Sequence, residues 1–164
     1  MAFRVFISHS TADLGMVYQL KYWLEANDVE AYVAQLYLQP GIPLAAKVRS
    51  AIAASDCVVA LLTKDGSRSA WVHDEVGIAE GLTIPILPVL ERGTALNGLL
   101  QGRECIEFDG SAPLDAVRNV VHVAHGLKLT KANQERTAAL ALMVLGLLAL
   151  AAVSSTPQEQ PSWR

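Results

Sequence analysis

The chain has 164 residues, of which 52% are hydrophobic and 18% are charged, and its formal net charge at pH 7 is −3. This length suits one domain with an appendage. Lysine and arginine form no dense cluster along the chain. A nucleic-acid partner is therefore not expected, because phosphate binding needs a concentrated basic surface.

Short apolar runs of strand length alternate with longer helical patterns in the first part of the chain. The pattern predicts strands at 3–7, 29–33, 57–63, 84–90 and 103–108, and helices at 14–27, 44–54, 70–81 and 113–127. Alternation of this kind is typical of a parallel, doubly wound sheet with right-handed crossovers. The fold class is therefore predicted as α/β, with a flavodoxin-like five-stranded parallel sheet plus a C-terminal hydrophobic helix.

Both cysteines, Cys57 and Cys105, fall in predicted strands. In a flavodoxin-like strand order a third strand separates these two, by about 9–10 Å. A disulfide needs Cα atoms within about 7 Å, so no bridge is expected. Two buried thiols fit a reducing compartment.

The character of the sequence changes after the predicted domain. Four parts are predicted: a globular domain (1–127), a polar linker (128–136), a transmembrane helix (137–155) and a short tail (156–164). Residues 137–155 contain no charge and would span about 28 Å as a helix, close to the thickness of a bilayer core. Lys128, Lys131 and Arg136 precede this stretch, which predicts a single-pass membrane protein with its globular domain in the cytoplasm. A hydrophobic oligomerisation helix, or one buried against the domain, is the alternative.

The most informative motif runs from Trp71 to Glu75 and follows the apolar run 57–63. In a helix, Trp71 and Glu75 stand at i and i+4 and share one face. That face begins just beyond the carboxyl end of a buried strand, where open α/β sheets bind their ligands. A flat aromatic surface beside one carboxylate suits a sugar that carries a planar base.

Three segments together resemble the Toll/interleukin-1 receptor (TIR) domain family, which includes NAD-cleaving enzymes. Residues 6–9 resemble the first-strand box of the family, and residues 38–41 resemble the Pro-Gly loop after the second strand. Residues 69–75 resemble the Ser-x-Trp-x-x-x-Glu segment that carries the catalytic glutamate. The match covers residues 3–126 in the family's order, so residues 1–127 are interpreted as a TIR domain with the TIR fold.

The resemblance implies an NAD+ glycohydrolase or ADP-ribosyl cyclase that acts on self-assembly, as a homo-oligomer with TIR–TIR contacts, in immune or stress signalling. NAD+ is then the substrate, and no separate cofactor is expected. Glu75 is the expected catalytic residue, because a single carboxylate can stabilise the oxocarbenium character that develops on the ribose. By position alone, the alternative for Glu75 is an exposed first-turn glutamate that favours the helix dipole.

The resemblance also implies contacts to NAD+ around Glu75. The expected contacts are Ser8, His9, Ser10, Trp71, Ser69 and Gln35. His9 and Ser10 depart from many NAD-cleaving relatives, which carry an aromatic residue followed by arginine at these positions. Trp71 is expected to stack on nicotinamide or to cover the crevice, with ordinary packing as the alternative. For Ser69, a helix cap is expected in preference to a ligand contact. Gln35 lies in an apolar loop at 34–43 that resembles the family's self-association loop.

Other readings of the same architecture find less support. A receiver domain would need acidic residues after the first strand, where this chain has Ser8 and His9. His122 and His125 stand three residues apart, but no third ligand lies nearby in sequence, so no metal site is expected.

The alternative function is a non-catalytic TIR adaptor that signals by self-association.

Overall fold

The computed structural model describes residues 2–34 and 43–154, with side chains described as far as Leu145. Five parallel strands form one sheet in the order β2-β1-β3-β4-β5. The strands are β1 (Phe3–Ser8), β2 (Val29–Tyr32), β3 (Cys57–Leu62), β4 (Ile86–Glu91) and β5 (Ile106–Phe108), and the helices are α1 (Leu14–Glu25), α2 (Leu44–Ala53), α3 (Ala70–Gly81) and α4 (Pro113–Ser154). The predicted α/β class with a flavodoxin-like five-stranded sheet is confirmed.

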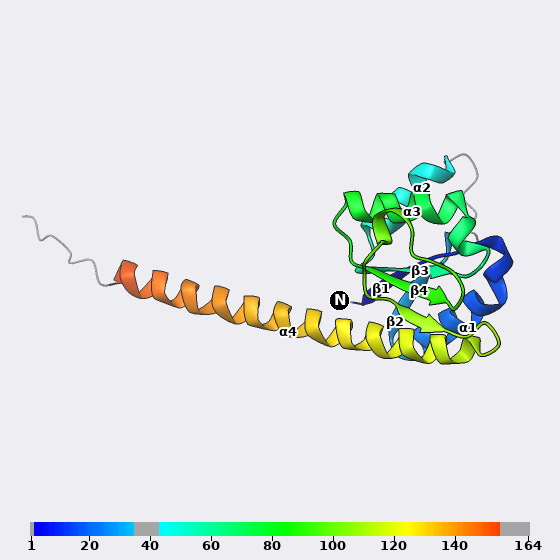
Figure 1. Ribbon diagram of the computed structural model, residues 1–164. Helices are drawn as coiled ribbons and strands as arrows, with labels where there is room; N and C mark the ends of the chain where they lie inside the picture. The colour runs from blue at the N-terminus through cyan, green and yellow to red at the C-terminus, as the bar shows by residue number, and fades with distance from the viewer. Residues whose placement is uncertain (1, 35–42, 155–164) are drawn as a thin grey trace, which may run out of the picture. The chain divides into compact units, whose positions relative to one another are not determined.

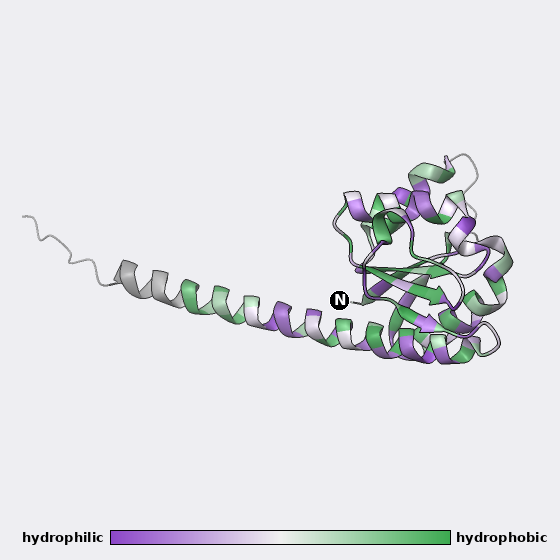
Figure 2. Ribbon diagram, in the orientation of Figure 1, coloured by the Kyte–Doolittle hydropathy of each residue, from purple (hydrophilic) through white to green (hydrophobic). Residues whose placement is uncertain are grey.

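Helices cover both faces of the sheet. α1 and residues 116–124 of α4 pack on one face, and α2 and α3 pack on the other (Figure 1). All six residues of β3 are buried, as a central strand covered on both sides requires. Figure 2 shows hydrophobic residues gathered along the strands. This arrangement fixes the carboxyl ends of β1 and β3 side by side, since Ser8 is paired with Ala60.

Two strands begin later than the sequence pattern predicts. The Ile84 N–H donates to the Ala79 carbonyl at 2.9 Å, so this residue belongs to the turn that follows α3, and the strand starts at Ile86. The Arg103 N–H donates to the Leu100 carbonyl at 3.1 Å in a tight turn, which delays β5 to Ile106.

The cysteine prediction is partly corrected by the late start of β5. Cys57 lies in β3, whereas Cys105 immediately precedes β5 and lies outside the strand. Strand β4 separates β3 from β5 in the sheet, as predicted. Both thiols are free.

Contacts divide the chain into two compact units, Met1–Gly126 and Leu127–Arg164. The helix predicted to end near residue 127 continues as α4 to Ser154 and so includes the polar stretch 128–136. No proline interrupts this stretch, and Lys131 and Glu135 form an i, i+4 ion pair at 3.9 Å.

A search of the described residues found no helix with both the length and the apolar character that crossing a membrane demands. The predicted transmembrane segment 137–155 ends at Ser155, which lies outside the described residues. The tail 156–164 lies outside them as well.

Candidate active site at the carboxyl edge of the sheet

Ser8 and Glu75 form the centre of the candidate site. Ser8 is the last residue of β1 and is fully buried. Its Oγ donates a hydrogen bond of 2.5 Å to Oε2 of Glu75 in the second turn of α3. Oε1 of Glu75 makes no hydrogen bond within the described parts of the chain, so this oxygen remains available to a ligand.

A short turn after β3 sets the direction of α3. The Gly66 N–H donates to Thr63 Oγ1 at 2.9 Å, which holds the 3-10 turn Gly66–Arg68 against the end of β3. Ser69 then acts as the helix N-cap, because its Oγ accepts from the Val72 N–H at 3.4 Å. Ser69 is therefore a helix cap, and α3 begins at Ala70 as the sequence predicts.

Glu75 is buried, with an exposed fraction of only 3%. The reading of Glu75 as an exposed first-turn glutamate is therefore wrong, since the side chain lies in the second turn and faces the sheet. Burial raises the pKa of Glu75 from its usual 4.5 to about 7. The hydrogen bond from Ser8 and the neighbouring Trp71 indole lower this pKa only in part, and the charge of Asp74 raises it further.

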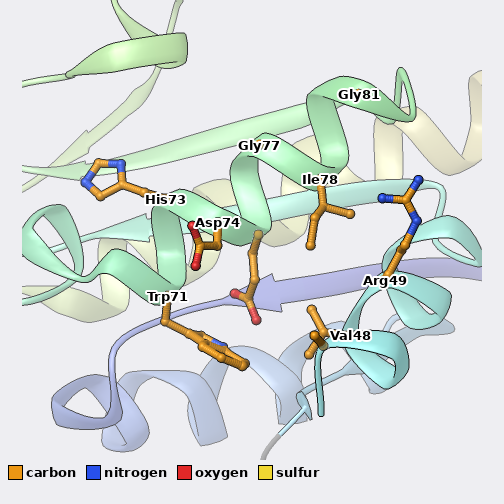
Figure 3. Close-up of a pocket in the computed structure, with 10 residues that line it drawn as sticks. Val48, Arg49, Trp71, His73, Asp74, Gly77, Ile78 and Gly81 are labelled. Atoms are coloured by element: carbon orange, nitrogen blue, oxygen red, sulfur yellow. The ribbon is translucent and has the colours of Figure 1, made fainter. Parts of the chain in front are cut away.

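Two cavities lie at the site: Glu75 lines one of them, and Trp71 lines both. The Glu75 cavity has a volume of about 500 Å³ and lies between α2 and α3; its lining includes Val48, Arg49, Trp71, Asp74, Glu75 and Ile78. The Lys47 cavity has a volume of about 560 Å³ and is lined by His9, Ser10, Thr11, Ala34, Leu44, Lys47, Ser69 and Trp71. Figure 3 shows Trp71, Val48 and Ile78 turned toward the Glu75 cavity. The Trp71 Nε1–H is buried and has no hydrogen-bond partner of good geometry among the described residues.

His9 and Ser10 lie at the rim that the sequence predicts. His9 is 2% exposed, and its Nδ1 donates to the Ile7 carbonyl at 3.2 Å. Burial lowers the pKa of His9, which keeps the ring neutral and its Nε2 an acceptor. This Nε2 has no hydrogen-bond partner in the described part of the chain. His9 itself lines the Lys47 cavity. Ser10 accepts from the Ala12 N–H at 3.3 Å and also lines that cavity.

Lys47 is a polar residue of the site that the sequence analysis missed. It lies on α2 and is only 9% exposed. Its Nζ donates to the Ala34 carbonyl at 2.8 Å, just beyond the end of β2. No sequence signal marks it, because lysines on helices are ordinarily exposed to solvent.

The structure thus brings together most of the residues expected to contact NAD+. Ser8, Trp71 and Glu75 adjoin one another, and His9, Ser10 and Ser69 line the Lys47 cavity next to Trp71. Gln35 lies outside the described residues.

The remaining histidines of interest lie away from the centre of the site. His73 points away from Trp71 in Figure 3, and its Nε2 pairs with the Ser67 carbonyl at 2.9 Å. His122 and His125 are exposed on α4. Within residues 2–34 and 43–154, no group of three or more potential ligands is arranged to hold a metal ion.

A family model and several solved structures match the globular part of the chain. The family model described as TIR domain matches residues 5–121. The TIR domain of the Toll-related receptor TRR-2 from Hydra magnipapillata superposes with a TM-score of 0.62 at 21% identity, covering 73% of this chain and 96% of that one. The TIR domains of the activated Roq1 resistosome, which recognises the pathogen effector XopQ, give a TM-score of 0.50 at 20% identity, covering 56% of this chain and 59% of that one.

A nucleotide-cleaving enzyme shares the same fold. The CMP N-glycosidase BcmB from Clostridium botulinum gives a TM-score of 0.53 at 17% identity, covering 71% of this chain and 97% of that one. No curated protein sequence is significantly similar to the chain.

Proposed function

The chain belongs to the TIR domain family, and from this premise we propose that it cleaves the bond between nicotinamide and ribose in NAD+, as an NAD+ glycohydrolase or ADP-ribosyl cyclase. One observation carries the proposal. Glu75 is a buried carboxylate with one oxygen held by Ser8 and the other free, beside the indole of Trp71 and a cavity of about 500 Å³. Such a site has the groups that N-glycoside cleavage needs.

The proposed reaction breaks the bond between C1′ of the ribose and N1 of nicotinamide. The bonding electron pair leaves with the ring, so the pyridinium departs as neutral nicotinamide and no general acid is required. Positive charge develops on the ribose, and ionised Glu75 stabilises it, more strongly in a buried site than in water. In hydrolysis, water then adds to C1′, one proton is released and ADP-ribose is formed. In cyclisation, an atom of the adenine replaces water as the nucleophile that attacks C1′.

Ser8 and Trp71 have supporting roles in this proposal. Ser8 fixes the Glu75 carboxylate and lowers its pKa, which favours the ionised form. The Trp71 indole, which lines the cavity beside Glu75, provides a flat face for the nicotinamide ring. The C. botulinum CMP N-glycosidase indicates that a sheet of this kind is compatible with N-glycoside cleavage of a nucleotide.

The second candidate is a non-catalytic TIR adaptor that signals by self-association. The observation that favours it lies at His9 and Ser10, which replace the aromatic residue and arginine of many NAD-cleaving relatives. TIR domains assemble in the Roq1 resistosome, and both candidates include homo-oligomerisation through TIR–TIR contacts. A role in immune or stress signalling is proposed for either one.

Anchoring at a membrane is part of the proposal and rests on the sequence alone. Residues 137–155 carry no charge, and basic residues precede them. Such an anchor would confine the TIR domains to two dimensions and raise their local concentration. The TIR domain would then face the cytoplasm.

The decisive experiment compares the full-length protein with its Glu75→Gln variant, at concentrations that promote assembly. Chromatography measures nicotinamide released from NAD+. We expect Glu75→Gln to lose at least about a hundredfold in rate, because it removes a preorganised charge from the transition state. Glu104→Gln is the matched control, since Glu104 is exposed and lines neither cavity. Equal release by wild type and Glu75→Gln would overturn the assignment of Glu75, and no release by either protein would leave the adaptor as the better account.

A further inference from the structure

Resting on the proposed function, we propose that Lys47 binds the phosphate groups of the substrate and so makes the enzyme select a phosphorylated nucleotide over the corresponding nucleoside. Lys47 lines the Lys47 cavity, which shares Trp71 with the Glu75 cavity.

Lys47 is a buried cation that has no counter-charge among the described residues. Its ammonium has three N–H donors, and the Ala34 carbonyl accepts one of them. No carboxylate forms an ion pair with it among the described residues. The stretch 35–42, which precedes α2 in sequence, contains no aspartate or glutamate, and neither does α2 itself. An unpaired buried charge is costly, so an anion entering the cavity would be stabilised by the ammonium.

The other polar groups of the Lys47 cavity suit the same ligand. Its described lining contains no carboxylate, and the hydroxyl-bearing residues Ser10, Thr11 and Ser69 line it together with Lys47. Hydroxyl protons and an ammonium are donors for phosphate oxygens. His9 lines the same cavity, and its buried Nε2 is an acceptor without a partner among the described residues.

The two cavities together match the order of groups in a nucleotide. The Glu75 cavity carries Arg49 beside the acidic residues Asp74 and Glu75, whereas Lys47 is the one lysine, arginine, aspartate or glutamate on the described lining of the Lys47 cavity. Trp71 lines both, so a ligand that passes this indole reaches from one to the other. A ribose held at Glu75 would thus direct its 5′-phosphate toward Lys47, and a nucleoside would leave the Lys47 cavity without an anion.

The experiment compares NAD+ with nicotinamide riboside, which has the same scissile bond and no phosphate. Nicotinamide release is measured for the full-length wild type, Lys47→Gln and Lys47→Arg. Glutamine retains an N–H for the Ala34 carbonyl while removing the charge, and arginine retains the charge; melting curves check that each variant is folded. We expect Lys47→Gln to reduce kcat/KM for NAD+ about ten- to hundredfold, through a higher KM. The kcat/KM of Lys47→Gln for nicotinamide riboside should equal that of the wild type. Lys47→Arg, which keeps the charge, should retain most of the wild-type kcat/KM for NAD+. Equal losses on both substrates, or no loss on NAD+, would overturn the proposal.

A binding measurement separates this inference from the proposed function. Calorimetry measures the dissociation constant of ADP-ribose for two catalytically disabled proteins, Glu75→Gln and the double variant Glu75→Gln/Lys47→Gln. This measurement does not depend on turnover. A dissociation constant weakened at least about tenfold by Lys47→Gln would support the phosphate site even if the wild type failed to cleave NAD+. An unchanged constant, or no binding of ADP-ribose by the Glu75→Gln protein, would overturn it even if the wild type cleaved NAD+.

Discussion

Ser8 at the end of β1 and Glu75 in α3 are 67 residues apart in sequence and are joined by a buried hydrogen bond of 2.5 Å. The serine hydroxyl donates to Oε2, and burial outweighs this bond in setting the pKa of Glu75 at about 7. The charge state of Glu75 therefore changes near neutral pH, and the Ser8 hydroxyl favours its ionised form.

The first prediction concerns the pH dependence of NAD+ cleavage. Because the ionised form of Glu75 stabilises the developing positive charge, kcat/KM is expected to rise with pH around a midpoint of about 7. Ser8→Ala removes a hydrogen bond that lowers the pKa of Glu75, so it should move the midpoint to higher pH. A pH–rate profile of both proteins tests this. A Ser8→Ala midpoint at or below that of the wild type would contradict the role given to Ser8.

The second prediction concerns stability. The folded pKa of Glu75, about 7, lies above its usual 4.5, so the folded state holds the proton more tightly than the unfolded state does. The resulting stabilisation is fully present below pH 4.5 and is lost as the pH rises through about 7. The loss is on the order of 3 kcal/mol.

Urea unfolding of the wild type and Glu75→Gln, repeated from about pH 4.5 to 8, isolates this effect. Glutamine does not titrate, and the contribution of His9 is common to both proteins. The free energy of unfolding of the wild type should fall relative to that of Glu75→Gln as the pH rises. A constant difference across this range would show that the Glu75 pKa is close to its ordinary value.

The fold was accessible from the sequence because its signals are local. The apolar runs at 3–7 and 57–63 predict buried parallel strands, and the structure has β1 and β3 there. Boundaries were predicted less well where hydrogen bonds of a turn compete with the strand pattern. The turn from Leu100 to Arg103 delays β5, although the residues before Ile106 read as strand.

The candidate site was predicted only in part, because burial depends on contacts between distant segments. The spacing of Trp71 and Glu75 predicts their shared helix face, but whether that face meets solvent or the sheet is decided by the packing of α3 on β1 and β3. The same holds for Lys47, whose sequence neighbours resemble those of any surface lysine. Its burial arises from contact with Ala34 after β2.

The third prediction concerns the uncharged segment 137–155. If this segment anchors the protein, the full-length chain should sediment with membranes and be released by detergent but not by high salt, since burial of apolar residues does not depend on ionic strength. A chain lacking residues 137–164 is the matched comparison and should stay in the supernatant. Full-length protein in a detergent-free soluble fraction would leave 137–155 as an oligomerisation helix.

The fourth prediction concerns Gly66, in the turn that sets the direction of α3. A Cβ at this position would lie 2.1 Å from the Leu61 carbonyl oxygen, which is backbone and cannot rotate away. Gly66→Ala should therefore lower the free energy of unfolding by about 1–3 kcal/mol or more, because the turn must shift to relieve the overlap. Gly15→Ala in α1 is the control: a Cβ there meets nothing within 4 Å, so its stability should equal or slightly exceed that of the wild type. Urea midpoints measure both effects, and a Gly66→Ala protein as stable as Gly15→Ala would mean that the turn tolerates displacement from β3 without cost.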